Sequence, residues 1–275
     1  MSSLARKLRR ENKTIGFVPT MGALHEGHLS LVQEARQMCD VVIVSIFVNP
    51  QQFNDKKDLE KYPRDLPADA ALLSEYMVDY IFAPDEEEIY GEKFSTYVYV
   101  EGLTETLEGA SRPGHFRGVA TIVTILFNTV RPDFAFFGQK DAQQVAVIKR
   151  LTQDLGFDTE IVVLPIVREE SGLAMSSRNS RLSDEERQKA AIIYQALKRA
   201  KLAFRDGERS GSRLKQIVRE TIESEPLADI DYVAVVNNET LEPVEKIDDK
   251  EVLIAVAVNF AGVRLIDNTV LNRRQ

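Results

Sequence analysis

Short apolar runs alternate with helix-periodic segments through the first two thirds of the chain. The apolar runs lie at residues 15–18, 41–47, 80–83, 134–138 and 159–164. Segments with apolar residues at helical spacing lie between them, at residues 29–38, 66–75, 119–130 and 143–155. Nearly unbroken apolar runs are typical of strands buried on both faces of a parallel sheet. The alternation predicts an α/β fold with a doubly wound parallel sheet, which binds ligands beyond the carboxyl ends of its strands.

The pattern changes after Val167, where a loop rich in Ser, Gly and Arg begins. Ser183 and Glu186 then have the spacing of a capping box, which predicts a long helix that ends near Gly207. A second helix is predicted at 213–223, and strands at 230–236, 252–260 and 263–266. Helices followed by antiparallel strands indicate a smaller α+β domain. With a hinge in the connecting loop, the expected domains are residues 1–168 and 169–275.

Composition limits the partners and the compartment. The net charge is −8, and nucleic-acid binding normally needs an excess of Lys and Arg, so we expect no nucleic-acid partner. No apolar run approaches the ~20 residues that span a bilayer. The N-terminal residues are polar, so we expect no secretory signal there. The single cysteine, Cys39, excludes an intrachain disulfide and indicates a reducing compartment. We expect a cytoplasmic protein with no membrane partner, in which Cys39 is buried and inert.

The segment from Pro19 to His28 holds two of the three histidines of the chain. It links an apolar run to a helix-periodic segment, a position where backbone N–H groups and the helix dipole attract anions. His25 and His28 are three residues apart, so both rings fall on one face of the first helical turn. Gly27 leaves no side chain to keep a base or a sugar from the backbone. The segment suits nucleotide phosphates, although an ordinary βα turn with two exposed histidines has the same sequence.

Polar residues also follow two other predicted strands. Asn49 and Gln52 come after the run at 41–47, where amides can bind hydroxyls and carboxylates, although Asn-Pro also favours a simple turn. Lys140 stands at a predicted helix N-terminus, where the dipole favours anions, so its position makes sense if an anion lies beside it. Asp141 fits either a helix N-cap or an acceptor for ribose hydroxyls.

Two loops add hydroxyls, guanidinium groups and the third histidine. Residues 175–178, Met-Ser-Ser-Arg, can wrap phosphate oxygens, although a polar linker has the same composition. His115 lies between Arg112 and Arg117. All three histidines therefore lie in segments of this kind, which favours a site crowded with phosphates.

Taken together, these stretches resemble the family of pantoate–β-alanine ligases, the pantothenate synthetases. Residues 19–28 are similar to that family's version of the HxGH signature of nucleotidyltransferases. Other blocks match in order and spacing, at residues 47–53, 62–64, 107–109, 112–118, 137–144 and 172–179. The resemblance extends from about Thr14 to Arg181 and is weaker beyond. HxGH alone indicates only the superfamily, whereas its combination with these blocks is specific to the ligase.

The resemblance implies a Rossmann-like N-terminal domain, a smaller C-terminal lid and a homodimer, for which the alternating run at 94–100 offers a strand that could pair. It also implies a two-step reaction. The carboxylate of pantoate attacks the α-phosphate of ATP, which gives pantoyl adenylate and pyrophosphate. The amine of β-alanine then attacks the acyl carbon, which releases AMP and pantothenate. Magnesium (Mg2+) accompanies the triphosphate.

The resemblance further implies a role for each site residue. Its catalytic residues are His28, His25 and Lys140, with His28 nearest the α-phosphate and Lys140 between phosphate and pantoate. The ATP-binding residues it implies are Met21, His25, His28, Gly138, Lys140, Asp141, Val167, Met175, Ser176, Ser177 and Arg178. The pantoate-binding residues it implies are Gln52, Gln144, Met21 and Phe53. Asp69 is placed on the magnesium side, although a helix N-cap explains this residue equally well.

Two other functions fit parts of the pattern. Another nucleotidyltransferase of the superfamily that takes a phosphorylated substrate would need extra cations in its acceptor pocket, where Gln52 and Gln144 are neutral. A nucleotide-binding module without catalysis would have little use for the Ser-Ser-Arg segment on a hinge. We therefore expect an ATP-dependent ligase.

Overall fold

The chain forms two compact units. The computed structural model describes residues 1–248 and 250–272. The first unit comprises Met1–Gly138 and Val147–Pro165, and the second comprises Gln139–Ala146 and Ile166–Gln275. These units differ from the predicted domains in two respects. The later division falls between 165 and 166 instead of 168 and 169, and the segment at 139–146 joins the second unit.

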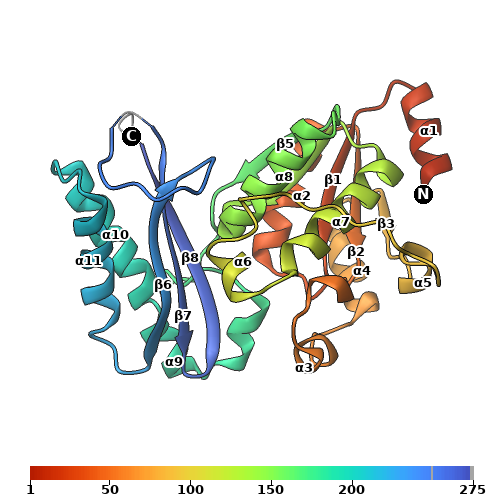
Figure 1. The fold of residues 1–275 in the computed structure, drawn as a ribbon. Helices are drawn as coiled ribbons and strands as arrows, with labels where there is room; N and C mark the ends of the chain where they lie inside the picture. Colours follow the sequence, from red (N-terminus) through yellow and green to blue (C-terminus); the bar gives the residue numbers. More distant parts are fainter. Residues whose placement is uncertain (249, 273–275) are drawn as a thin grey trace. The chain divides into compact units, whose positions relative to one another are not determined.

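The first unit contains a parallel sheet of five strands (Figure 1). The strands are β1 (Ile15–Thr20), β2 (Val41–Ile46), β3 (Tyr80–Phe82), β4 (Phe134–Gly138) and β5 (Glu160–Leu164). Their order is β3-β2-β1-β4-β5, and all neighbours pair in parallel. The predicted doubly wound sheet is therefore confirmed. Its strand order reverses between β1 and β4, which is the point where such sheets bind their ligands.

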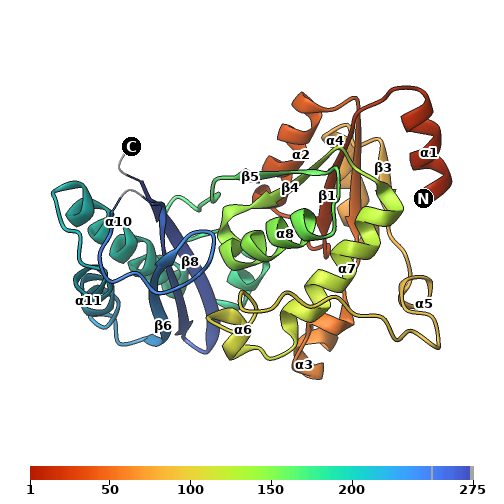
Figure 2. The same ribbon diagram turned by 45° about the horizontal axis from the view of Figure 1, so that its top comes forward.

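Helices cover both faces of this sheet (Figures 1 and 2). Val32 of α2 (Glu26–Met38) and Leu73 of α4 (Leu66–Glu75) pack in one buried cluster with Val18 of β1. The preceding residue of that strand, Phe17, meets Phe127 of α7 (His115–Val130) edge to face, with 6.4 Å between ring centroids. Successive strand residues point to opposite faces, so α7 lies on the face opposite α2 and α4.

The remaining helical elements of the first unit are mostly short, whereas α8 contributes the almost fully buried Ile148 and Leu151. These helical elements are α1 (Ser2–Arg10), the 3₁₀ turn η1 (Pro50–Gln52), α3 (Lys56–Glu60), α5 (Glu86–Ile89), α6 (Glu108–Ser111) and α8 (Ala142–Asp154), which follows the 3₁₀ turn η2 (Gln139–Asp141). The division between the two units falls within α8. Within the described part of the chain, no helix is both long and apolar enough to cross a membrane.

The second unit is an antiparallel sheet covered by helices (Figure 1). Its elements are the 3₁₀ turn η3 (Ser177–Arg181), α9 (Asp184–Ala190), α10 (Ile192–Arg205), α11 (Gly211–Ile222), β6 (Ala228–Asn237), β7 (Val252–Phe260) and β8 (Val263–Leu271). The strand order is β6-β7-β8. Leu197 of α10 and Leu214 of α11 share a core with Val256 of β7, and all three are almost fully buried. The predicted smaller α+β part is confirmed.

One predicted helix is wrong, and one predicted run forms no strand within the chain. The capping box of Ser183 and Glu186 forms, but the expected single helix divides into α9 and α10. At the break, the N–H of Ala191 bonds to the carbonyl of Gln188, an i−3 bond that tightens the turn. Residues 94–100 form no strand. There the N–H of Val98 bonds to the hydroxyl of Thr121 in α7 at 3.0 Å. Pairing of this run with a second copy of the chain stays a prediction.

Cys39 is buried, as predicted, and lies against the backbone of Gly16 in β1. Burial raises the pKa of the Cys39 thiol to about 11, with a smaller contribution from Asp133. The thiolate is the reactive form, so the native thiol is expected to be inert at neutral pH.

The burial of Cys39 predicts its reactivity. We expect no reaction of the folded protein with a water-soluble aromatic disulfide. After unfolding in guanidinium, the single thiol of the chain should react. Rapid labelling of the folded protein would contradict this picture.

Candidate active site

Two histidines cap the helix that follows β1. His25 is the N-cap of α2, and its Nδ1 accepts a hydrogen bond from the N–H of Gly27 at 3.1 Å. The Nδ1 of His28 accepts in return from the N–H of His25 at 3.4 Å, which completes a reciprocal capping box. The ring centroids lie 4.1 Å apart. The predicted juxtaposition of the two rings is confirmed, and helix capping is its cause.

This cap selects a tautomer for each neutral ring. A ring nitrogen that accepts a hydrogen bond carries no proton, so the proton of each neutral imidazole lies on Nε2. An Nε2–H group beside a helix N-terminus is a donor in a place where the helix dipole already favours anions. The loop therefore carries N–H donors whose hydrogen bonds phosphate oxygens can accept.

A buried carboxylate holds the loop between β1 and α2. Asp69 of α4 is 6% exposed, and its two oxygens accept from the N–H groups of Ala23 at 3.0 Å and Leu24 at 2.9 Å. Gly22 and Ala23 have positive φ values of 77° and 51°. A Cβ at Gly22 would lie 2.8 Å from Oδ2 of Asp69, so only glycine allows this close approach. Asp69 thus fixes the backbone between Met21 and His25.

The sequence allowed two interpretations of Asp69, and the first of them, the N-cap of its helix, is wrong. Asp65 caps α4, and its side chain accepts from the N–H of Ala68. The other interpretation, a magnesium-side residue, stays a prediction. Direct coordination would compete with the two backbone bonds of Asp69. Among the residues that the structure describes, no three His, Cys, Asp or Glu side chains form a group suited to a metal ion.

The first pantoate residue predicted from sequence lies beside the histidine loop. Gln52 ends the 3₁₀ turn η1 after β2, and its Nε2 is 2.9 Å from the sulfur of Met21. Its Oε1 accepts from the side-chain amide of Asn49 at 3.1 Å. Phe53 follows directly and packs edge to face against Tyr62 at 5.7 Å between centroids. The structure therefore brings Met21 and Gln52 together, because β1 and β2 are neighbours in the sheet.

Asn49 supports this turn from within the core. It is 1% exposed, and its amide donates to the carbonyl of Gly118 at 3.1 Å. Its Oδ1 accepts from the hydroxyl of Tyr90 at 2.7 Å. Burial raises the pKa of Tyr90, so the phenol keeps the proton that it donates. A Cβ at Gly118 would overlap the carbonyl of Gln51, which explains why α7 carries a glycine where it meets the turn.

The third histidine, His115, contacts the backbone of Gln52. The Nδ1 of His115 lies 2.8 Å from the backbone carbonyl of Gln52, and a guanidinium nitrogen of Arg112 donates to the same carbonyl at 3.3 Å. These two residues were expected among phosphates. Their contacts with Gln52 hold the backbone of a predicted pantoate residue, and their place beside phosphates stays a prediction.

Gly138, a predicted ATP-binding residue, ends β4 in the first unit. The second unit carries the remaining predicted site residues, in two segments. Lys140 and Asp141 lie in the 3₁₀ turn η2, immediately before α8, and Gln144 lies in the first turn of that helix. Lys140 and Gln144 are half-buried, and Asp141 is exposed. The expected position of Lys140 at a helix N-terminus is confirmed. Both interpretations of Asp141 stay open.

The other segment is a tight turn followed by η3. The N–H of Met175 donates to the carbonyl of Val167 at 3.0 Å, and Gly172 makes the turn with φ 96°. The Oγ of Ser176 accepts from the N–H of Arg178 at 3.3 Å. Asn179, 3% exposed, anchors η3 by donating to the carbonyl of Ala174 at 3.0 Å. The turn thus brings Val167 beside Met175 and orders the Ser-Ser-Arg segment.

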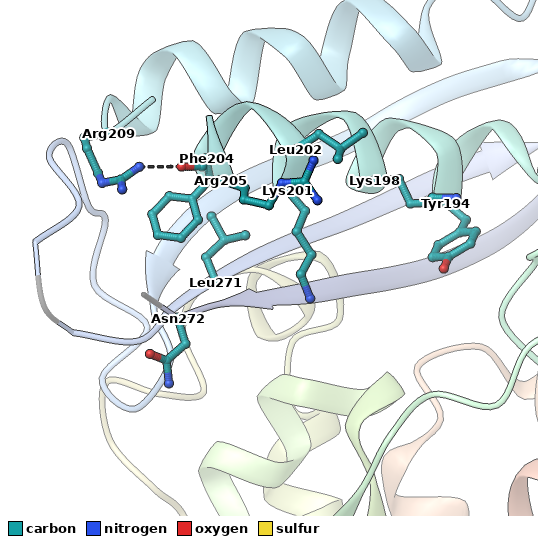
Figure 3. A pocket seen from close by; sticks show the side chains of 9 residues that line it. All are labelled: Tyr194, Lys198, Lys201, Leu202, Phe204, Arg205, Arg209, Leu271 and Asn272. Carbon is teal, nitrogen blue, oxygen red and sulfur yellow. Dashed lines mark hydrogen bonds between the residues drawn. The ribbon is translucent and has the colours of Figure 1, made fainter. Parts of the chain in front are cut away.

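A separate cavity of about 470 Å³ lies beside α10 in the second unit (Figure 3). Its lining consists of Tyr194, Lys198, Lys201, Leu202, Phe204, Arg205, Arg209, Leu271 and Asn272. Arg209 donates to the carbonyl of Phe204, as Figure 3 shows. None of the site residues predicted from sequence belongs to this lining, so the cavity carries no part of the candidate site.

The fold and the capped histidines define a nucleotidyltransferase-like α/β protein. A doubly wound sheet presents the histidine pair at the carboxyl end of β1, on one side of the point where the strand order reverses. The model of the family described as pantoate-beta-alanine ligase matches residues 1–270, and the chain belongs to this family.

Individual relatives agree over nearly the whole length. The chain is 56% identical over 271 residues to the pantothenate synthetase of Heliobacterium modesticaldum, covering 98% of this chain and 96% of that protein. The crystal structure of pantothenate synthetase from Thermus thermophilus has a TM-score of 0.89 at 47% identity and 96% coverage of each chain. The pantoate-beta-alanine ligase of Francisella tularensis, complexed with beta-gamma ATP and beta-alanine, has a TM-score of 0.77 at 36% identity, covering 98% of this chain and 95% of that one.

The contacts of Asp69 predict a specific effect on stability. Replacing Asp69 with Ala should lower the free energy of unfolding by about 3 kcal/mol, because two hydrogen bonds to a charged group are lost at roughly 1.5 kcal/mol each. The matched control, Asp65→Ala, removes only a helix N-cap and should cost about 1 kcal/mol. Urea titration measures both. An unchanged midpoint for Asp69→Ala would show that Asp69 does not hold the loop.

Proposed function

We propose that this chain catalyses the ATP-dependent condensation of pantoate with β-alanine to give pantothenate, AMP and pyrophosphate. Membership of the pantoate–β-alanine ligase family supports this proposal. The structural observation that carries it is the reciprocal cap of His25 and His28, which follows Met21, together with the contact of Met21 with Gln52 of η1. The two segments together combine donors for phosphate with a neutral amide and an apolar wall for a hydroxy acid.

The first step joins pantoate to the α-phosphate. A carboxylate oxygen of pantoate forms a bond to the α-phosphorus, the bond from that phosphorus to the bridging oxygen breaks, and pyrophosphate leaves. This displacement needs positioning and charge neutralisation more than proton transfer. The Nε2–H groups of His25 and His28 donate to phosphate oxygens, with His28 at the α-phosphate. Lys140 places a positive charge between phosphate and pantoate.

Other residues hold the parts that do not react. Ser176, Ser177 and Arg178 bind the departing pyrophosphate, and the planar guanidinium suits bidentate contact with its oxygens. Gly138 and Asp141 contact the ribose, and the backbone of Val167, next to Met175, contacts adenine.

Pantoate is bound by neutral groups. The amides of Gln52 and Gln144 bind its hydroxyls and carboxylate, while Met21 and Phe53 pack against its carbon skeleton. In the second step, the amine of β-alanine attacks the acyl carbon. A C–N bond forms, the C–O bond to AMP breaks, and the amine loses a proton.

Magnesium enters the proposal as part of the substrate, MgATP. Mg²⁺ keeps several waters and is usually bound by phosphate oxygens with one or two carboxylates. Asp69 does not fit as a direct ligand, because both its oxygens accept backbone N–H groups. We therefore derive no step through the metal. A homodimer and a cytoplasmic location complete the proposal.

The decisive experiment is exchange of labelled pyrophosphate into ATP, with magnesium and pantoate but without β-alanine. We expect exchange that depends on pantoate, because formation of the adenylate is reversible. Adding β-alanine should then convert the mixture to pantothenate. Exchange supported by another carboxylic acid, and not by pantoate, would indicate a different nucleotidyltransferase. A folded protein that binds ATP without any exchange would indicate a nucleotide-binding module.

His28→Ala tests the donor at the α-phosphate. Removing one donor to the transition state should lower the exchange rate by ~10² to 10⁴-fold while the fold persists. Gln33→Ala, an exposed position on the same helix α2, is the matched control and should exchange like the unmodified chain. The two rates are compared at saturating ATP and pantoate, with circular dichroism as the check on folding. Equal rates for both variants would remove His28 from the mechanism.

Gln52→Ala tests the pantoate pocket. The KM for pantoate should rise by about 10-fold or more, and the KM for ATP should change little, because a site group left without its amide partner loses ~1.4 kcal/mol or more. Gln51→Ala, the neighbouring glutamine of the same turn, is the control and should affect pantoate far less. A parallel rise in both KM values for Gln52→Ala would mean that the residue supports the loop and does not bind pantoate.

A further inference from the structure

Two adjacent residues of the last strand bind the two site segments of the second unit. Asp267 and Asn268 lie in β8 and are 4% and 3% exposed. Their side chains reach residues that precede them by more than 90 positions in the chain, at separations of 99 for Arg168 and 129 for Gln139. No sequence pattern marked either residue.

Asn268 holds the turn that carries Lys140. Its Nδ2 donates to the carbonyl of Gln139 and to the carbonyl of Lys140, both at 2.9 Å. Its Oδ1 accepts from the side-chain amide of Gln139 at 3.2 Å. A carboxamide has both donors and an acceptor, so one side chain fixes two successive peptide groups. These bonds set the direction in which the side chain of Lys140 leaves the backbone.

Asp267 holds the turn between Val167 and Met175. Its two oxygens accept from the guanidinium of Arg168 at 2.6 Å and 2.9 Å, a bidentate pair. Arg168 also donates to the carbonyl of Gly172 at 3.1 Å and stacks on the ring of Tyr194 at 3.9 Å. Burial raises the pKa of Asp267, while Arg168 opposes that shift. Through Arg168, the ion pair therefore holds both sides of this turn, at Arg168 and at Gly172, against β8.

The two anchors are themselves joined. The backbone N–H of Asn268 donates to Oδ1 of Asp267 at 2.7 Å, the same oxygen that binds Arg168. Asn268 also pairs with Ala255 of β7 in the regular register of the sheet. The anchors thus share one strand and one carboxylate oxygen.

We propose that Asp267 and Asn268 are positioning residues: Asn268 orients Lys140, and Asp267 orients the turn that carries Val167 and Met175. This inference rests on the proposed function, in which Lys140 acts between phosphate and pantoate. A lysine near a helix N-terminus is opposed by the dipole, so without an anchor its ammonium group would turn toward solvent. A displacement of about 1 Å at a reacting group can cost ~10²-fold in rate, which makes such an anchor effective.

Asn268→Ala is the primary test, because its partners are backbone carbonyls and no charge is left unpaired. We expect kcat for pantoate-dependent exchange to fall by ~10 to 10²-fold, with little change in the KM for ATP. Asn259→Ala, a half-buried asparagine of β7 in the same sheet, is the matched control and should retain full kcat. Thermal unfolding midpoints of the two variants are compared. A kcat for Asn268→Ala equal to that of the control would overturn the inference.

A double-mutant cycle with Lys140→Ala separates positioning from plain stabilisation. If Asn268 acts through Lys140, then Asn268→Ala should cost nothing further in a chain that already carries Lys140→Ala. Fully additive losses would show that the two residues act independently and would overturn the inference. If Asn268→Ala does not fold, Gln139→Ala takes its place in the cycle. That variant removes one bond of the anchor outside β8, and it should lower kcat less while showing the same lack of additivity.

The cycle also distinguishes failure of this inference from failure of the proposed function. Loss of exchange in Lys140→Ala together with normal exchange in Asn268→Ala contradicts only the positioning role. Normal exchange in Lys140→Ala removes Lys140 from the mechanism and overturns the inference with it. Absence of pantoate-dependent exchange in the unmodified chain would refute the proposed function before any variant is compared.

Discussion

Backbone groups that leave a buried sheet must find hydrogen-bond partners, and this constraint governs the candidate site. The strands β1 and β2 are covered on both faces, so the loops at their carboxyl ends start within the core. Unpaired N–H and C=O groups there would cost free energy comparable to a lost hydrogen bond. Buried polar side chains supply the partners: Asp69 for two N–H groups of the loop after β1, and Asn49 for the N–H of Gln51 in the turn after β2. In the second unit, Asn268 does the same for the turn at Lys140.

The same bonds that satisfy the backbone also order the side chains proposed for chemistry. His25 illustrates this most directly, since its ring caps α2 through Nδ1 and so places its proton on Nε2. Capping and phosphate binding therefore use opposite edges of one ring. His115 and Arg112 show the complementary case, because their contacts hold the carbonyl of Gln52. The residue type alone therefore does not show whether a histidine or an arginine contacts phosphate or supports another residue.

Local patterns predicted the regular elements well because they depend on neighbours in sequence. The buried apolar runs became β1, β2 and β4, and the capping box at Ser183 formed as expected. The expected long helix breaks at Ala191, whose N–H bonds to the carbonyl of Gln188 three residues before it. Residues 94–100 take an irregular path, along which the N–H of Val98 bonds to Thr121 of another helix. Periodicity carries no information about such partners.

The sequence by itself determined the class of fold, the position of the histidine pair at the start of a helix and the resemblance to one ligase family. These depend on residue type and short spacing, which alone specify a period, a cap or a motif. The tertiary structure decided which side chains support the others: Asp69 under the histidine loop, and Asp267 and Asn268 beside the turns of Arg168 and Lys140. The last two partners lie 99 and 128 residues away along the chain, and only folding brings such groups within hydrogen-bond distance.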